Sequence, residues 1–164
     1  MRTLILYYSN SGNTQRVSEA LAQRLDAELG EVTCAANLDW NGPHAMGWDI
    51  FTRHRPHIDM LTPPGAHYDL TVIGGPVWAA RAAPPVMRVL ADHGRELGRV
   101  GLFVTRSGSS PRFPPEPAIA EMAAMLPAPA VATHIFRQAE IISGAYRVEV
   151  AEFARALRTE QAAV

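Results

Sequence analysis

The sequence predicts a single-domain α/β protein of the doubly wound type, with five parallel strands and helices on both faces of the sheet. Short apolar runs alternate with amphipathic segments along the chain, which is the pattern of a parallel sheet with helical crossovers. Loops that contain glycine together with serine, asparagine or tryptophan follow three of these runs. The length of 164 residues suits one domain, and no shift in composition marks a second. We therefore treat 1–164 as one domain.

The first strand is expected at residues 3–8, because a strand covered on both faces is continuously apolar. A helix should follow from Asn13 to Leu29, ended by Gly30. Its buried stripe would comprise Val17, Leu21, Leu25 and Leu29.

The second strand is predicted at Glu31–Ala36. Segment 37–66 reads as a connection to the third strand, with one helix across Met46–His54. It either covers the crevice, contributes to a dimer contact or packs in the core. The later strands are expected at 69–73, 99–105 and Val131–Phe136, and the later helices at Val86–His93, at 117–126 and from a cap at Ser143.

The first loop has the composition of a phosphate cradle. It offers hydroxyl and amide donors, a glycine and the free N–H groups of a helix start, in the order Ser9, Asn10, Ser11, Gly12, Asn13 and Thr14. The lysine of a P-loop and the glycine spacing of a dinucleotide fingerprint are both missing. Ordinary turn chemistry explains the same residue types, so composition alone leaves both interpretations open.

Two further segments repeat the pattern of an apolar run followed by a loop. They are Tyr68–Trp78 and Val100–Ser110. Together with the first loop, in this order, they resemble the flavodoxin family. The resemblance covers nearly the whole chain, and 37–66 fits it least. Ser18 departs from the small residue, usually alanine, that the family places four positions after Thr14.

The resemblance implies bound FMN and the strand order 2-1-3-4-5, with the crevice at the carboxyl ends of strands one and three. The first loop would hold the phosphate. The isoalloxazine ring would lie between the other two loops, contacting Pro76, Val77, Trp78 and Ala79 on one side and Arg106, Ser107, Gly108, Ser109 and Ser110 on the other. Trp78 would stack on the ring, although tryptophan also serves subunit interfaces.

Ala79 occupies a place where the family commonly has glycine, whose peptide flips when the flavin is reduced. Because positive φ costs a residue with a Cβ about 1 kcal/mol, we expect this flip to be disfavoured and the flavin to be reduced mainly in two-electron steps. Arg81, Arg106 and Arg112 flank the same loops and would favour reduction by attracting the negative charge of the reduced ring. Alternatively, these arginines are exposed to solvent on the loops and have no effect on the flavin.

The composition excludes several functions. All fifteen cationic side chains are arginine, dispersed along a chain with a net charge of −1, which does not suggest nucleic acid. The strong negative field of typical flavodoxin carriers is also missing. One cysteine, Cys34, precludes an internal disulfide and is expected as a buried, inert thiol. The six histidines show no metal-ligand spacing, and no catalytic serine, histidine or acid constellation is evident.

Met1–Tyr8 has no secretory character and no run is long enough for a membrane span, so we expect a cytoplasmic protein. The first functional hypothesis is an FMN-binding electron-transfer protein with a redox partner protein or a small-molecule acceptor. The second is a small FMN-dependent NAD(P)H or quinone reductase. The third is a regulatory FMN-binding module without a redox task. A homodimer is left open.

Overall fold

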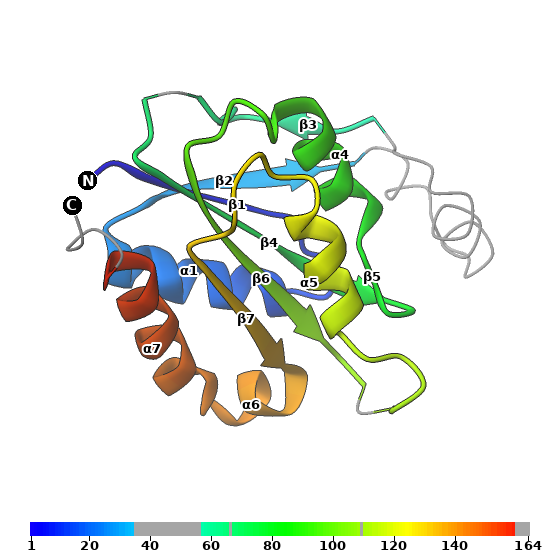
Figure 1. Cartoon of the computed structure of the whole chain (residues 1–164). Helices are drawn as coiled ribbons and strands as arrows, with labels where there is room; N and C mark the ends of the chain where they lie inside the picture. Colours follow the sequence, from blue (N-terminus) through cyan, green and yellow to red (C-terminus); the bar gives the residue numbers. More distant parts are fainter. Residues whose placement is uncertain (35–56, 66, 109, 160–164) are drawn as a thin grey trace.

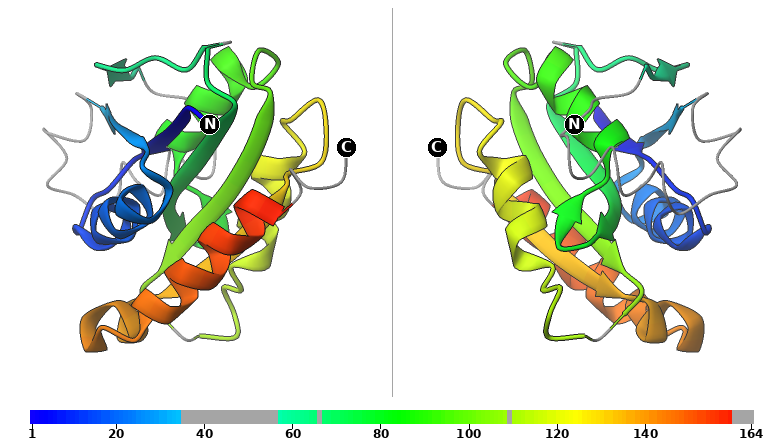
Figure 2. Two further views of the ribbon diagram at one scale, coloured as in Figure 1. Left: turned by 90° about the vertical axis from the view of Figure 1, so that its left-hand side faces the viewer. Right: turned by 90° about the vertical axis from the view of Figure 1, so that its right-hand side faces the viewer.

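The computed structural model describes residues 1–34, 57–65, 67–108 and 110–159. Its elements are β1 (Thr3–Tyr7), α1 (Asn13–Leu25), β2 (Glu28–Thr33), β3 (Asp59–Met60), β4 (Leu70–Trp78), β5 (Arg81–Ala82), α4 (Pro84–His93), β6 (Arg99–Arg106), α5 (Glu116–Ala123), β7 (Ala132–Arg137), α6 (Gln138–Ser143) and α7 (Tyr146–Thr159). Figure 1 shows a twisted sheet with helices on both faces, and Figure 2 shows it edge-on.

The sheet has the order β3-β2-β1-β4-β6-β7, with β5 paired to β4. The five longer strands, β2, β1, β4, β6 and β7, are parallel to their neighbours. The two short strands pair antiparallel, β3 with β2 and β5 with β4. The prediction of five strands was therefore wrong in number: within the described residues the sheet has seven, and it is mostly rather than wholly parallel.

Alternation of side chains along the strands divides the core into two halves. On β1, Leu4 and Leu6 join the half under α4 and α5, while Ile5 joins the half under α1 and α7. On α7, Tyr146, Val150, Phe153 and Leu157 are all buried and form one apolar stripe. The two helical layers thus cover the strands and leave their carboxyl ends open for loops.

The first helix ends earlier than predicted. Asp26 adopts a left-handed conformation with φ 52° and terminates α1 after Leu25. Leu29 and Gly30 belong to β2, where Leu29 pairs with Ile5 and is 36% exposed. The second strand accordingly spans Glu28–Thr33 rather than Glu31–Ala36. Leu29 lies four residues after Leu25, which is the spacing of an apolar stripe on a helix. This spacing explains why the helix was predicted to extend to Leu29.

The last helical segment is split. Gly144 has φ 85° and ends α6, a short helix that the sequence did not predict. Ser143 is the last residue of α6 and its hydroxyl donates to the carbonyl of Glu140, so it does not begin the final helix as a cap. The helix expected at 117–126 spans Glu116–Ala123. The helix expected across Met46–His54 lies outside the described residues.

Cys34 follows β2 directly and is 4% exposed, as expected for a core thiol. None of the helices in the described part of the chain has the length and apolar character needed to cross a membrane.

Candidate cofactor site

The carboxyl ends of β1, β4 and β6 lie side by side, which brings the three predicted loops to one edge of the sheet. Direct contacts join them. The amide of Tyr8 donates to the carbonyl of Gly74 (3.1 Å), and the Tyr8 and Trp78 rings meet edge to face with centroids 5.9 Å apart. Thr14 and Thr105 share a buried hydrogen bond of 2.8 Å between their hydroxyls. The first loop is therefore tied to both others.

Gly12 forms the turn from the first loop into α1. Its φ of 81° suits glycine, and a Cβ built at this position would meet no atom within 4 Å. The space above the backbone is therefore open. A ligand atom can therefore approach the peptide here without meeting another described residue.

The start of α1 leaves backbone donors unused. Gln15 N–H donates to Ser9 Oγ (3.3 Å) and Arg16 N–H donates to the carbonyl of Gly12 (3.1 Å). In the part of the chain that the structure describes, the N–H groups of Asn13 and Thr14 have no acceptor within the protein. These two donors, together with the positive end of the helix dipole, favour a bound anion.

The other predicted loop residues differ in their accessibility. Asn10 and Ser11 are exposed, and Asn13 Nδ2 donates to Ser11 Oγ (3.3 Å). Thr14 is only 2% exposed, so its hydroxyl anchors the helix to β6 rather than lining the open surface. Ser18 is fully buried, its Oγ has no hydrogen-bond partner among the described residues, and it contributes nothing to the cradle surface.

The second loop is more ordered than the sequence suggested. Pro76, Val77 and Trp78 continue β4, and only two residues separate Trp78 from Arg81, its antiparallel partner on β5. The loop is therefore the tip of a β-hairpin. Trp78 is half-buried and packs against the core beside Tyr8, which fixes the plane of its indole.

Ala79 and Ala80 form the hairpin tip with φ of 48° and 65°. Two consecutive positive φ values suit a tight hairpin turn that usually takes Asn-Gly, not Ala-Ala. The hairpin thus holds Ala79 in a backbone region that is costly for a residue with a Cβ. The expectation that the peptide flip is disfavoured stays a prediction. Strain is thus built into the tip next to Trp78.

We expect Ala80→Gly to raise the free energy of unfolding by up to about 1 kcal/mol, because glycine adopts positive φ without strain. Ala124→Gly is the matched control, since Ala124 is exposed with φ −65° and should lose stability when replaced. Urea unfolding of the two variants measures the difference. Equal losses in both would show that the tip is not strained.

The third loop begins at Arg106, whose Nε donates to the carbonyl of Gly108 (2.5 Å). Ser107, Gly108 and Ser110 are exposed, whereas Ser109 lies outside the described residues. The Arg112 guanidinium lies 6.0 Å from the Phe113 ring centroid. The loop therefore offers exposed backbone and hydroxyl groups.

Arg81 is not the uncompensated cation that the sequence suggested. Its guanidinium forms an ion pair with Glu121 of α5, and the two side chains are only 30% and 26% exposed. Sequence reasoning did not identify Glu121 or Thr105 as partners at this edge. No pattern in the sequence indicates that Glu121 contacts Arg81. Thr105 could have been identified, because it is the last buried residue before the third loop.

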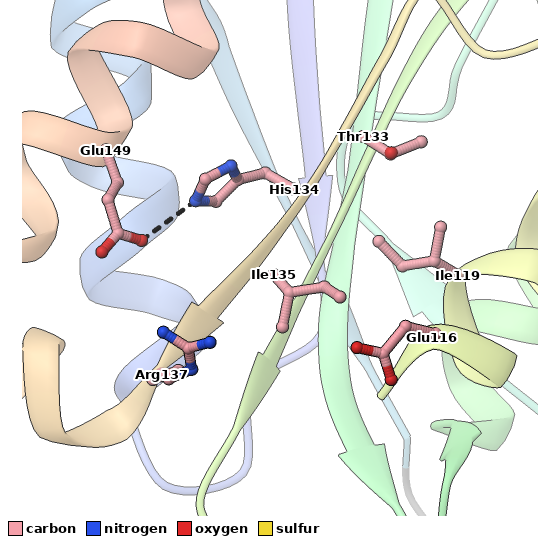
Figure 3. Close-up of a pocket in the computed structure, with 7 residues that line it drawn as sticks. All are labelled: Glu116, Ile119, Thr133, His134, Ile135, Arg137 and Glu149. Carbon is pink, nitrogen blue, oxygen red and sulfur yellow. Dashed lines mark hydrogen bonds and ion pairs between the residues drawn. The ribbon is translucent and has the colours of Figure 1, made fainter. Parts of the chain in front are cut away.

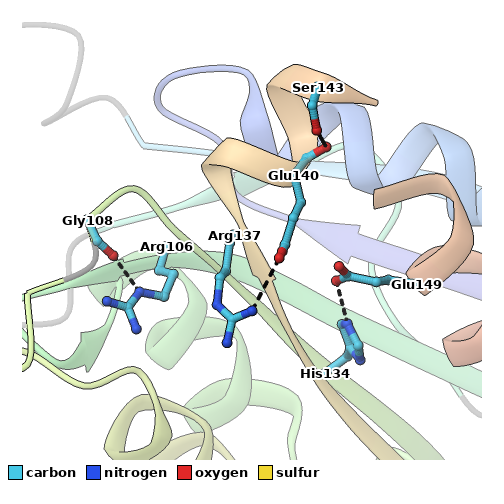
Figure 4. A network of polar contacts seen from close by, with 7 residues as sticks. All are labelled: Arg106, Gly108, His134, Arg137, Glu140, Ser143 and Glu149. Carbon is cyan, nitrogen blue, oxygen red and sulfur yellow. Dashed lines mark hydrogen bonds and ion pairs between the residues drawn. The ribbon is translucent and has the colours of Figure 1, made fainter. Parts of the chain in front are cut away.

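Arg137 was also missed. It is in register with Arg106 on the neighbouring strand, and Figure 4 shows the two side chains side by side, with Arg137 donating to Glu140 (3.2 Å). A cavity of 450 Å³ opens along the same strand (Figure 3). On one side of β7 it is bounded by Glu116 and Ile119 of α5. On the other, His134 pairs with Glu149 of α7 (2.9 Å).

Burial, with Glu31 and Glu19 nearby, raises the pKa of Tyr7 at the end of β1. Tyr7 therefore stays a neutral phenol at neutral pH and adds no negative charge near the first loop. Among the described residues there is no group of three or more histidine, cysteine or acidic side chains that could hold a metal ion.

Comparison with known proteins agrees with this geometry. The profile of the flavodoxin family matches residues 2–116, which include all three loops. A flavoprotein from Lactobacillus acidophilus NCFM, crystallised in complex with FMN, is 24% identical with a TM-score of 0.70, covering 87% of this chain and 97% of that one. A Bacteroides uniformis ATCC 8492 protein described as a flavoprotein is 24% identical with a TM-score of 0.71 and coverage of 94% and 97%.

Oxidised flavodoxin 2 from Bacillus cereus shares the fold at 14% identity, with a TM-score of 0.57 and coverage of 98% and 99%. No protein with a curated description matches the chain. The family profile spans more than half of the chain, from β1 to the start of α5. The chain belongs to the flavodoxin family.

Proposed function

We propose that this protein binds FMN in the crevice at the carboxyl ends of β1, β4 and β6 and takes part in electron transfer. The observation that carries the proposal is the open backbone at Gly12, set at the start of α1 and tied to the two other loops by the Thr14–Thr105 and Tyr8–Trp78 contacts. The FMN complex of the Lactobacillus acidophilus flavoprotein supports the choice of cofactor.

The first loop would hold the phosphate without a cation. A phosphate ester carries nearly two negative charges at neutral pH, and the donors available are the N–H groups of Asn13 and Thr14, the Ser11 hydroxyl and the exposed Asn10 amide. Ser9 and Gly12 shape the turn. Neutral donors at a helix N-terminus are sufficient for such a group, because each bond to a charged oxygen is stronger than a neutral one.

Trp78 would form one wall of the ring site. Its position is fixed by Tyr8 and by the hairpin, and Arg81 anchors that hairpin to Glu121 of α5. The exposed backbone of Ser107 and Gly108 would face the polar edge of the ring. When bound, FMN supplies the redox chemistry, and the chain supplies position and electrostatics.

A second candidate is an NAD(P)H or quinone reductase. The observation that favours it is the 450 Å³ cavity beside β7, one strand from the third loop, with Arg137 in its lining and Arg106 adjacent. A protein that only docks to other proteins needs no such cavity, whereas a reductase needs room for a small substrate. The net charge of −1 also favours a reductase, because it gives little electrostatic attraction toward a basic partner protein.

Anaerobic absorption spectroscopy of the purified protein, with and without added FMN, tests the proposal. We expect a bound-flavin spectrum that bleaches on reduction with dithionite. Addition of NADH or NADPH with a quinone then separates the candidates: rapid catalytic oxidation of the nucleotide supports the reductase, and its absence supports the carrier. If added FMN shows no spectral change and no saturable binding, both are wrong.

A further inference from the structure

A second cationic feature lies at the opposite edge of the sheet. The C-terminal ends of α1 and α7 lie side by side near the N-terminus in Figure 1, and residues of both helices line a cavity of 230 Å³. We call this cavity the arginine cavity. It is lined by Arg24, Ala151, Ala154, Arg155 and Arg158. An Arg158 guanidinium N–H donates to the carbonyl of Arg24 and ties the two helices together.

The charge around the arginine cavity is unbalanced. Three of its five lining residues are arginines and none is acidic. Within the described residues, other arginines such as Arg81 and Arg88 pair with carboxylates, whereas Arg24, Arg155 and Arg158 form no ion pair. Guanidinium groups stay protonated at any physiological pH, so the three repel one another.

The helix ends offset only part of this charge. Each helix C-terminus is equivalent to about −0.5 elementary charge, so two ends give about −1 against three guanidinium charges. Counted over the lining residues and the two helix ends alone, about two positive charges are left over. This excess matches a dianion better than a carboxylate.

The shape of the cavity suits the same ligand. Ala151 and Ala154 provide a floor of small side chains, and 230 Å³ is about eight times the volume of a water molecule in the liquid. The planar guanidinium fork fits the oxygens of a phosphate in two parallel hydrogen bonds. We propose that the arginine cavity binds a phosphate group, either as free phosphate or on a small phosphorylated molecule.

This site is distinct from the cradle at Gly12. Helix α1 has 13 residues and runs from the first loop to the arginine cavity, so Asn13 and Leu25 lie about 18 Å apart along its axis. The proposal therefore does not depend on FMN binding.

Inorganic phosphate is the probe, titrated at constant ionic strength while the amide and arginine Nε–H signals are followed by NMR. We expect saturable shifts at Arg24, Arg155 and residues 151–158, and binding of acetate at least about tenfold weaker. Arg155→Gln should weaken phosphate binding by about tenfold or more, because it removes a hydrogen bond between charged groups. Arg147→Gln is the matched control, since Arg147 lies on the same helix against the Tyr146 ring, outside the cavity.

Three results would overturn the proposal. The first is a shift that never saturates or that chloride reproduces. The second is equal phosphate affinity in Arg155→Gln and Arg147→Gln, each confirmed as folded by its spectrum. The third is a set of saturable shifts confined to the loop at 9–14, which would place phosphate in the cradle alone. Screening phosphorylated compounds against the wild-type protein then distinguishes free phosphate from a larger ligand. A larger natural ligand should displace phosphate at a lower concentration than phosphate itself requires to bind.

Discussion

Gly12→Asp is expected to weaken FMN binding by about 100-fold or more while leaving the affinity for riboflavin nearly unchanged. Aspartate tolerates positive φ better than most residues, and the space above Gly12 is open, so the fold should survive. The new carboxylate would lie where the phosphate is proposed to bind. Two like charges about 4 Å apart near a protein surface repel by several kcal/mol before screening by solvent and salt.

Gly12→Asn is the control, because it has nearly the same shape without the charge. Fluorescence quenching of both flavins by the three proteins gives the dissociation constants, and thermal melts check the fold. Similar losses in the Asp and Asn variants would show that bulk rather than charge matters. An equal loss of FMN and riboflavin would place the phosphate elsewhere.

Gly74→Ala is expected to lower the free energy of unfolding by about 3 kcal/mol, or roughly 6–12 °C in Tm. A Cβ at this position would lie 2.0 Å from the Phe103 ring. Phe103 is fully buried between the rings of Phe136 and Phe153, with centroids 5.7 and 6.4 Å away, so it has no room to move. Crowding in this core would also displace the end of β4, which leads to Trp78.

Gly98→Ala is the matched control, since a Cβ there meets nothing within 4 Å and should cost no stability. A second variant isolates the clash. Phe103→Leu replaces the ring with a smaller side chain. Adding Gly74→Ala to this variant should therefore lower the free energy of unfolding much less than adding it to the wild type. Purely additive losses in this cycle would show that the contact with Phe103 is not the cause.

The fold class could be predicted because its signals are local. Mostly apolar runs at Leu4–Tyr8 and Leu70–Ile73, each followed by a segment with glycine, are enough to indicate buried parallel strands and to place their loops at one edge. The boundaries were less predictable. Leu29 has the spacing of a helical stripe, and only the left-handed conformation of Asp26 removes it from α1. Leu29 instead pairs with Ile5 of β1, a contact between distant residues that local sequence does not encode.

The meeting of the three loops at one edge of the sheet was predictable, but the contacts of their residues were not. The sequence identified Thr14, Trp78 and Arg81, yet it could not show that Thr14 is buried against Thr105 or that Glu121 neutralises Arg81. These partners lie 91 and 40 positions away in the chain. The pairing of Arg106 with Arg137 likewise depends on strand register, which is fixed only when β6 and β7 assemble.

The most direct test of the account compares the affinity of the wild-type protein for FMN and for riboflavin under identical conditions, by isothermal titration calorimetry. If the helix start at Gly12 holds the phosphate, FMN should bind at least about 100-fold more tightly, since two hydrogen bonds to a charged group contribute about 1.5–3 kcal/mol each. Equal affinities for the two flavins would contradict the account.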